Sequence, residues 1–157
     1  MFNTRYNKLA PQSNVADSAG AVGGRKFTVD SRLASDSFVL AQWPLCELRR
    51  FDDQRYDWFM LVPKVPHCVE FLDLPLAQQQ QLAQETQHAA QLLKIHGQGS
   101  KLNVGALGNV VSQLHVHLVM RAEGDPAWPG PVWGHSPAQR FGDAEKNAEI
   151  KRWQALL

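Results

Sequence analysis

The chain has 157 residues, 44% of them hydrophobic, which suits one domain with a hydrophobic core. Its 16 basic and 15 acidic residues leave a formal net charge of +1, so no overall field attracts nucleic acid or an anionic membrane. Two cysteines are too few for a disulfide framework, and no apolar run is long enough to span a bilayer. We therefore expect a cytoplasmic protein without membrane or nucleic-acid partners.

The beginning of the chain predicts a tail followed by a compact domain. Residues 1–25 are rich in Asn, Ser, Ala and Gly and show no helical or strand periodicity, so we expect a flexible tail there. A single domain is expected over residues 26–157. Asp30 is placed to cap a short helix over residues 31–35, after which residues 38–40 turn extended.

The middle of the chain predicts a hairpin and a long helix. Two predicted strands, 45–51 and 58–62, flank the polar turn at residues 52–55, a pattern typical of an antiparallel hairpin. Pro75 suits the first turn of a helix, and the 3.6-residue apolar period continues to about His96.

The last part predicts two strands, an irregular loop and a helix. The strands are expected over residues 101–107 and 113–120, and Asp143 is placed to cap the final helix. Between them, the Pro- and Gly-rich segment 124–134 carries two tryptophans, which suit either a core or a cover over a site. Together the elements predict an α+β fold, with an antiparallel sheet of about five strands, one long helix, a short N-terminal helix and a C-terminal helix.

The predicted strand over residues 113–120 carries two histidines on one face. Side chains alternate along a strand, so the even-numbered apolar residues enter the core while Gln113, His115 and His117 point the other way. Two histidines at positions i and i+2 lie roughly 6 to 7 Å apart, close enough to contact one phosphate or one metal ion. This face is the candidate functional site.

Three interpretations of the histidine pair remain open from the residues alone. Backbone N–H groups at the preceding Gly108-Asn109 turn suit anionic oxygens, and a neutral imidazole can attack phosphorus while a second protonates the leaving oxygen. A zinc site normally needs at least three protein ligands, and the other histidines and cysteines lack supporting spacing. Two ordinary exposed sheet residues are the third possibility.

Residues 108–119, Gly-Asn-Val-Val-Ser-Gln-Leu-His-Val-His-Leu-Val, resemble the motif of the histidine triad family, in which three histidines alternate with apolar residues. In this alignment Gln113 takes the place of the first histidine, His115 that of the nucleophile and His117 that of the third. Asn109 takes the place of the phosphate-binding polar residue that follows the family's glycine. In the alternative register, with His117 as the nucleophile, Gly108 and Asn109 no longer align with the family's glycine and phosphate-binding residue.

The resemblance covers roughly residues 27–134. Asn103 is similar to an upstream asparagine of the family, and residues 59–66 and 71–74 are similar to its second strand and the entry to its main helix. The combination of Gln-Leu-His-Val-His with the later Trp-Pro-Gly-Pro-Val-Trp-Gly at 128–134 resembles a bacterial branch of the family.

The resemblance implies a homodimeric nucleotide hydrolase or nucleotidyl transferase without a metal or other cofactor. Its substrates are purine nucleoside phosphoramidates or dinucleoside polyphosphates, attacked at the α-phosphate by His115 to give a covalent nucleotidyl-histidine. His117 would assist the leaving group, while Asn103, Gly108, Asn109 and Gln113 would bind substrate. Glutamine carries no ionisable proton, so a nucleotide-binding module with weak or no turnover is an alternative. A small metalloprotein using the two histidines is a further one.

Overall fold

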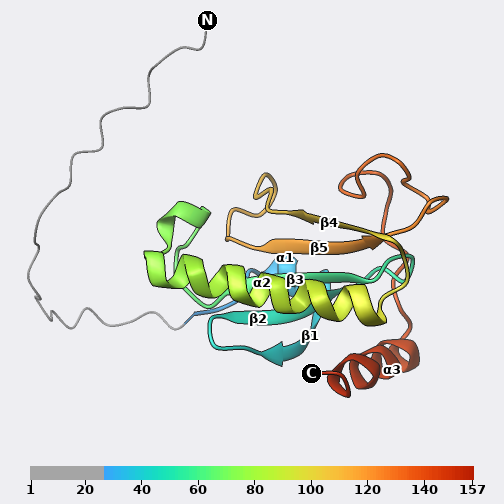
Figure 1. Cartoon of the computed structure of the whole chain (residues 1–157), viewed down its shortest axis with the longest axis horizontal. Helices are drawn as coiled ribbons and strands as arrows, with labels where there is room; N and C mark the ends of the chain where they lie inside the picture. The colour runs from blue at the N-terminus through green and yellow to red at the C-terminus, as the bar shows by residue number, and fades with distance from the viewer. Residues whose placement is uncertain (1–26) are drawn as a thin grey trace, which may run out of the picture.

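One antiparallel sheet organises residues 27–157, the part of the chain that the computed structural model describes (Figure 1). The tail predicted over residues 1–25 lies outside the described residues. The strand order is β1-β2-β3-β5-β4, and every neighbouring pair is antiparallel. The five strands are β1 (Ser37–Gln42), β2 (Cys46–Phe51), β3 (Trp58–Pro63), β4 (Lys101–Gly105) and β5 (Val116–Arg121). The α+β prediction and the β2-β3 hairpin are confirmed.

Two strands are shorter than predicted, because the chain between them leaves the sheet. β4 ends at Gly105, and β5 begins only at Val116. Gly108 adopts a positive φ of 68°, a conformation that glycine tolerates best. The backbone N–H of Leu114 then donates to the carbonyl of Cys68 instead of to a neighbouring strand. This loop brings the Gly108-Asn109 turn to the histidine end of β5.

The three α-helices lie where the sequence predicts them, but the start of two differs: Pro75 is the cap residue before the long helix and not part of its first turn, and the last helix has another cap. α1 (Ser31–Ser35) is capped by Asp30, whose carboxylate accepts from the Arg32 backbone N–H at 2.8 Å. A short 3-10 helix, η1 (Phe71–Asp73), precedes the long helix α2 (Leu76–His96), which crosses one face of the sheet (Figure 1). The last helix is α3 (Asp143–Gln154).

The prediction that Asp143 caps α3 is wrong. Asp143 is the first residue of the helix, and Gly142 occupies the cap position. The Glu145 carboxylate accepts from the Gly142 backbone N–H at 2.9 Å, so the acidic side chain that satisfies this end lies two residues after Asp143. No helix within residues 27–157 is sufficiently long and apolar to cross a membrane.

The main core lies between α2, α3 and one face of the sheet. Leu82, Ala89 and Leu93 of α2 are buried against the even-numbered apolar residues of β5, as the alternation predicts. Trp153 of α3 is fully buried, with its ring 4.6 Å from that of Phe59. Complete burial of a large aromatic side chain contributes on the order of 2 to 3 kcal/mol to the stability of the fold. This core leaves the opposite face of β5 free for the histidines.

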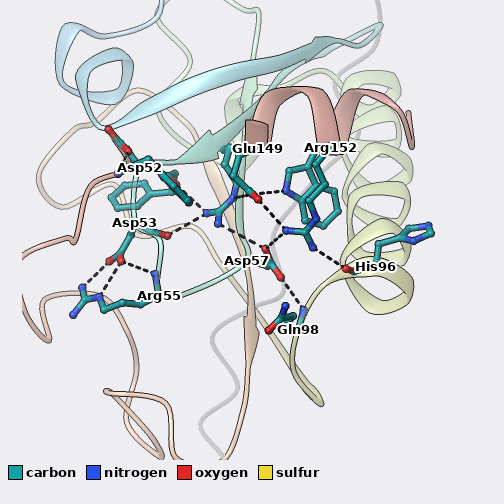
Figure 2. A network of polar contacts seen from close by, with 12 residues as sticks. Asp52, Asp53, Arg55, Asp57, His96, Gln98, Glu149 and Arg152 are labelled. Carbon is teal, nitrogen blue, oxygen red and sulfur yellow. Dashed lines mark hydrogen bonds and ion pairs between the residues drawn. The ribbon is translucent and has the colours of Figure 1, made fainter. Parts of the chain in front are cut away.

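A buried network of charges fixes α3 beside the β2-β3 hairpin (Figure 2). The guanidinium of Arg50 lies 3.4 Å from the Glu149 carboxylate and 3.7 Å from that of Asp57, and Arg152 contacts both carboxylates. Asp57 also accepts from the backbone N–H of Gln98 at 2.7 Å. Burial lowers the pKa of Arg50 from its ordinary value, while Asp57 and Glu149 act in the opposite direction. The sequence shows the charges but not this pairing.

Candidate active site

A cleft of about 480 Å³ opens beside the histidine end of β5. α1, the loop that contains the Gly108-Asn109 turn and the Pro- and Gly-rich segment after β5 form its sides. Its walls are mostly apolar or aromatic, and its polar lining is small. The residues that matter for its chemistry are His115, His117, Gly108, Asn109, Arg32, Asp36, Phe51, Trp58 and Trp133.

His115 is held with one ring nitrogen free. Its Nδ1 lies 2.7 Å from the main-chain carbonyl oxygen of Gln113. A carbonyl oxygen only accepts hydrogen bonds, so Nδ1 carries the hydrogen and Nε2 keeps its lone pair. The side chain is only 7% exposed, and it lines the cleft. Nε2 of His115 is therefore suited to nucleophilic attack.

His117 is held with the opposite proton arrangement. The indole Nε1–H of Trp58 donates to its Nδ1 at 3.0 Å. Because the indole nitrogen only donates, Nδ1 of His117 carries the lone pair, and Nε2 of the neutral ring carries the hydrogen. Burial first, and then the neighbouring His115, lower the pKa of His117 to about 3. The centroids of the two imidazole rings lie 4.8 Å apart, and the ring planes meet at 87°.

Aromatic rings pack around Trp58 and hold it against His117. Trp58 stacks on Phe51 at 4.1 Å between ring centroids, and its other neighbours include Trp133 at 6.4 Å in an edge-to-face geometry. A Cβ at Gly105 would lie 3.3 Å from the Trp133 ring, so glycine leaves room for that ring beside the strand. Trp133 thus lines the cleft, one of the two placements that the sequence left open for the loop tryptophans.

Asn103 does not join the cleft, although it was predicted to bind substrate. Its Oδ1 accepts from Arg121 Nη1 at 3.0 Å, and Arg121 also pairs with Asp125 at 2.7 Å. This group of side chains joins β4, β5 and the following loop. The structure therefore gives the Asn103 side chain a structural partner and no contact with the cleft.

Comparison with known proteins identifies the family. The family model of the HIT domain matches residues 32–124, more than half of the chain. The chain belongs to the histidine triad family. Among curated proteins, none matches the chain.

Three crystal structures of histidine triad proteins are similar along nearly their whole length. The protein from Sinorhizobium meliloti is 40% identical with a TM-score of 0.79, and the match covers 83% of this chain and 97% of that one. The protein from Marinobacter aquaeolei is 38% identical with a TM-score of 0.81, and the match covers 85% of this chain and 97% of that one. The protein from Bradyrhizobium japonicum is 37% identical with a TM-score of 0.79, and the match covers 83% of this chain and 98% of that one.

The glutamine at the predicted first triad position faces away from this cleft. Gln113 Nε2 donates to the carbonyl of Thr28 at 3.0 Å, and its Oε1 accepts from the Asp30 backbone N–H at 2.8 Å. Its side chain lines a different hollow, beside Cys68. Thus the main chain of Gln113 orients His115, while its side chain fixes the segment that enters α1.

Replacement of this glutamine should loosen the entry to α1. Gln113→Ala removes both hydrogen bonds, and we expect a loss of about 1 to 3 kcal/mol in the free energy of unfolding. Amide exchange at Asp30 should accelerate, since its N–H loses its acceptor. Gln113→Glu is the matched control, because it keeps an acceptor for Asp30. Equal exchange in Gln113→Ala and the wild type would contradict the assigned role.

The low pKa of His117 predicts a dependence of stability on pH. The folded chain leaves this imidazole neutral from its ordinary pKa of 6.5 down to about 3, whereas the unfolded chain protonates it. The unfolded state then binds more protons, so this group makes stability rise with pH across that window, by about 1.4 kcal/mol per unit at most. Urea denaturation at several pH values gives the free energy of unfolding of the wild type and of His117→Phe. Between pH 3 and 6.5 this free energy should rise more steeply with pH in the wild type, by up to this amount per pH unit. The same pH dependence of the free energy of unfolding in both proteins would refute the prediction.

The metal interpretation gains no support from the described part of the chain. Residues 27–157 contain no group of three or more His, Cys, Asp or Glu side chains arranged to hold a metal ion. Burial raises the pKa of both cysteine thiols, Cys46 and Cys68, above the ordinary value.

Proposed function

We propose that this histidine triad protein is a nucleotide hydrolase or nucleotidyl transferase that forms a covalent nucleotidyl intermediate on His115. The observation that carries the proposal is the complementary hydrogen bonding of two adjacent imidazoles: the partners of the two Nδ1 atoms leave a lone pair on His115 Nε2 and an N–H on His117 Nε2. One is a nucleophile, and the other is a donor for phosphate oxygens. The motif resemblance and the family relationship support the same chemistry.

In the first step the lone pair of His115 Nε2 forms a bond to the α-phosphorus. The bond from phosphorus to the leaving atom breaks, and its electron pair departs with that atom. Positive charge develops on the imidazole of His115, where the Gln113 carbonyl that accepts from Nδ1 stabilises it. Backbone N–H groups of the Gly108-Asn109 turn and the N–H of His117 are the proposed donors for the other phosphate oxygens.

In the second step water attacks the same phosphorus. The electron pair of the P–N bond returns to His115 Nε2, the proton of the water passes to solvent, and a nucleoside monophosphate is released. An acceptor other than water gives nucleotidyl transfer instead. The apolar and aromatic walls suit a purine base, and Arg32 at the edge of the cleft suits a further phosphate.

A substrate panel tests the proposal. Incubation with adenosine phosphoramidates, dinucleoside polyphosphates and activated adenylate esters should release adenosine monophosphate. Rapid quenching without acid should trap a protein heavier by one adenylyl group, with the adduct on the peptide that contains His115. Binding of adenosine monophosphate as a thermal shift, with no release from any of the substrates, would favour a binding module and contradict the enzymatic proposal.

The proposed assembly is a homodimer. The family resemblance carries this proposal, and the free edge of β4 is compatible with it, since Val104 is 50% exposed there. Sedimentation equilibrium should give twice the monomer mass. A monomer at micromolar concentration would contradict it.

A further inference from the structure

Trp58 is held independently of the histidine to which it donates. The β3-β5 register places Met60 opposite His117 and Trp58 opposite Val119, so the indole reaches His117 as a diagonal cross-strand neighbour. It stacks on Phe51 at 4.1 Å and contacts Tyr56 edge-on at 6.3 Å, and only 5% of the residue is exposed. Packing therefore fixes the direction of its N–H.

This fixed donor restricts what His117 can do. A hydrogen on the ring nitrogen that faces the indole would bring two N–H groups together at 3.0 Å between nitrogens, which is repulsive. The imidazole therefore stays neutral with its hydrogen on Nε2. A neutral imidazole that gave this hydrogen away would become an anion, so His117 donates a hydrogen bond without transferring the proton.

We propose that Trp58 is a positioning residue that holds His117 as a neutral Nε2–H donor, and that the site therefore favours nucleotides whose leaving group departs as a stable anion. This inference rests on the proposed function for its second half. The N–P bond forms with the lone pair of His115, the bond to the leaving oxygen breaks, and that oxygen keeps the electron pair without receiving a proton. Phosphate and carboxylate leaving groups meet this condition, whereas an alkylamine must first take up a proton.

The other ionisable groups of the cleft do not replace the missing acid. The Nδ1 hydrogen of His115 is bound by the Gln113 carbonyl. Asp36 is paired with Arg140 at 2.6 Å, and Arg32 carries a permanent charge. Among the described residues that line this cleft, His115, Asp36 and Arg32 are the only titratable or charged groups besides His117. Burial and the neighbouring His115 also lower the pKa of His117, which disfavours a cationic acid.

The first measurement needs no turnover. Nitrogen-15 spectra of the wild type with labelled histidine at neutral pH should show His117 with a protonated Nε2 and a hydrogen-bonded, unprotonated Nδ1. In Trp58→Phe, which keeps a ring against Phe51 and removes the N–H, the spectra should show both tautomers. Tyr56→Phe is the matched control, because it alters a neighbouring ring outside the cleft and should keep the wild-type tautomer.

The second measurement uses the p-nitrophenyl and phenyl esters of adenosine monophosphate, which differ mainly in the acidity of the leaving phenol. In single turnover the wild type should cleave the nitrophenyl ester at least about 100-fold faster, the order of rate that a missing general acid represents. Trp58→Phe should lose about 10- to 100-fold in kcat toward the nitrophenyl ester with a smaller change in KM, because His117 no longer presents one donor orientation.

Several outcomes would overturn the inference. A cationic His117, or an Nδ1–H tautomer in the wild type at neutral pH, removes its basis whatever the variant does, as does an unchanged tautomer in Trp58→Phe. Equal single-turnover rates for the two esters contradict the leaving-group preference. If neither ester is cleaved, the proposed function and the leaving-group preference fail together, while the spectra still decide the role of Trp58.

Discussion

His115→Gly is expected to lose at least about 10⁴-fold in kcat, the largest effect of any single substitution in this protein. The variant removes the nucleophile and leaves the cleft, the Gly108-Asn109 turn and His117 in place. Water must then attack the nucleotide directly, without the covalent intermediate. Because the side chain is replaced by a space of its own size, added imidazole should occupy it and restore part of the rate. Release of adenosine monophosphate with and without imidazole measures both effects.

A second histidine provides the matched control. His67 is exposed and adopts a positive φ of 59°, a conformation that glycine accepts more easily than histidine. His67→Gly should therefore fold and retain wild-type turnover, with no response to imidazole. Retention of more than about a tenth of the activity in His115→Gly would reject His115 as the nucleophile, since a catalytic nucleophile contributes far more than that.

The sheet and the long helix could be predicted because their signals are local. The two-residue alternation around His115 and His117 and the 3.6-residue period of α2 are properties of neighbouring residues. The same local reasoning placed Gly108 and Asn109 beside the histidines, and the structure lines one cleft with all four. What these patterns determine is which face a side chain occupies, not which side chain lies opposite.

The partners of the site residues could not be predicted, because they depend on contacts between distant segments. Trp58 and His117 are 59 residues apart, and their hydrogen bond depends on the register between β3 and β5. Gln113 meets Asp30 across 83 residues. The hairpin signal paired β2 with β3 but carried no information on which strand lies at the other side of β3. A bulky aromatic one strand away from a histidine would have been the only indication of the Trp58 contact.

Arg50→Met is expected to cost about 3 to 5 kcal/mol in the free energy of unfolding, the largest loss of stability that the structure predicts. The guanidinium is only 2% exposed and lies between the carboxylates of Asp57 and Glu149. Methionine keeps much of the side-chain volume but leaves the buried carboxylate of Asp57 and the half-buried carboxylate of Glu149 to share the single cation of Arg152. α3 should detach first, because this network joins it to the hairpin (Figure 2) and only the Lys146–Asp52 ion pair would remain intact between them. Urea denaturation followed by circular dichroism measures the change.

The comparison with an exposed arginine separates burial from charge. The Arg32 side chain is 64% exposed, and its nearest carboxylate contact, to Asp36, is 4.0 Å long. Arg32→Met removes the same charge and should change stability by less than about 1 kcal/mol, because solvent already screens that pair. A small effect in both variants would show that Arg152 alone neutralises the two carboxylates. A large effect confined to Arg50→Met would show that the network requires both cations, since each carboxylate must keep a partner of its own to offset its lost hydration.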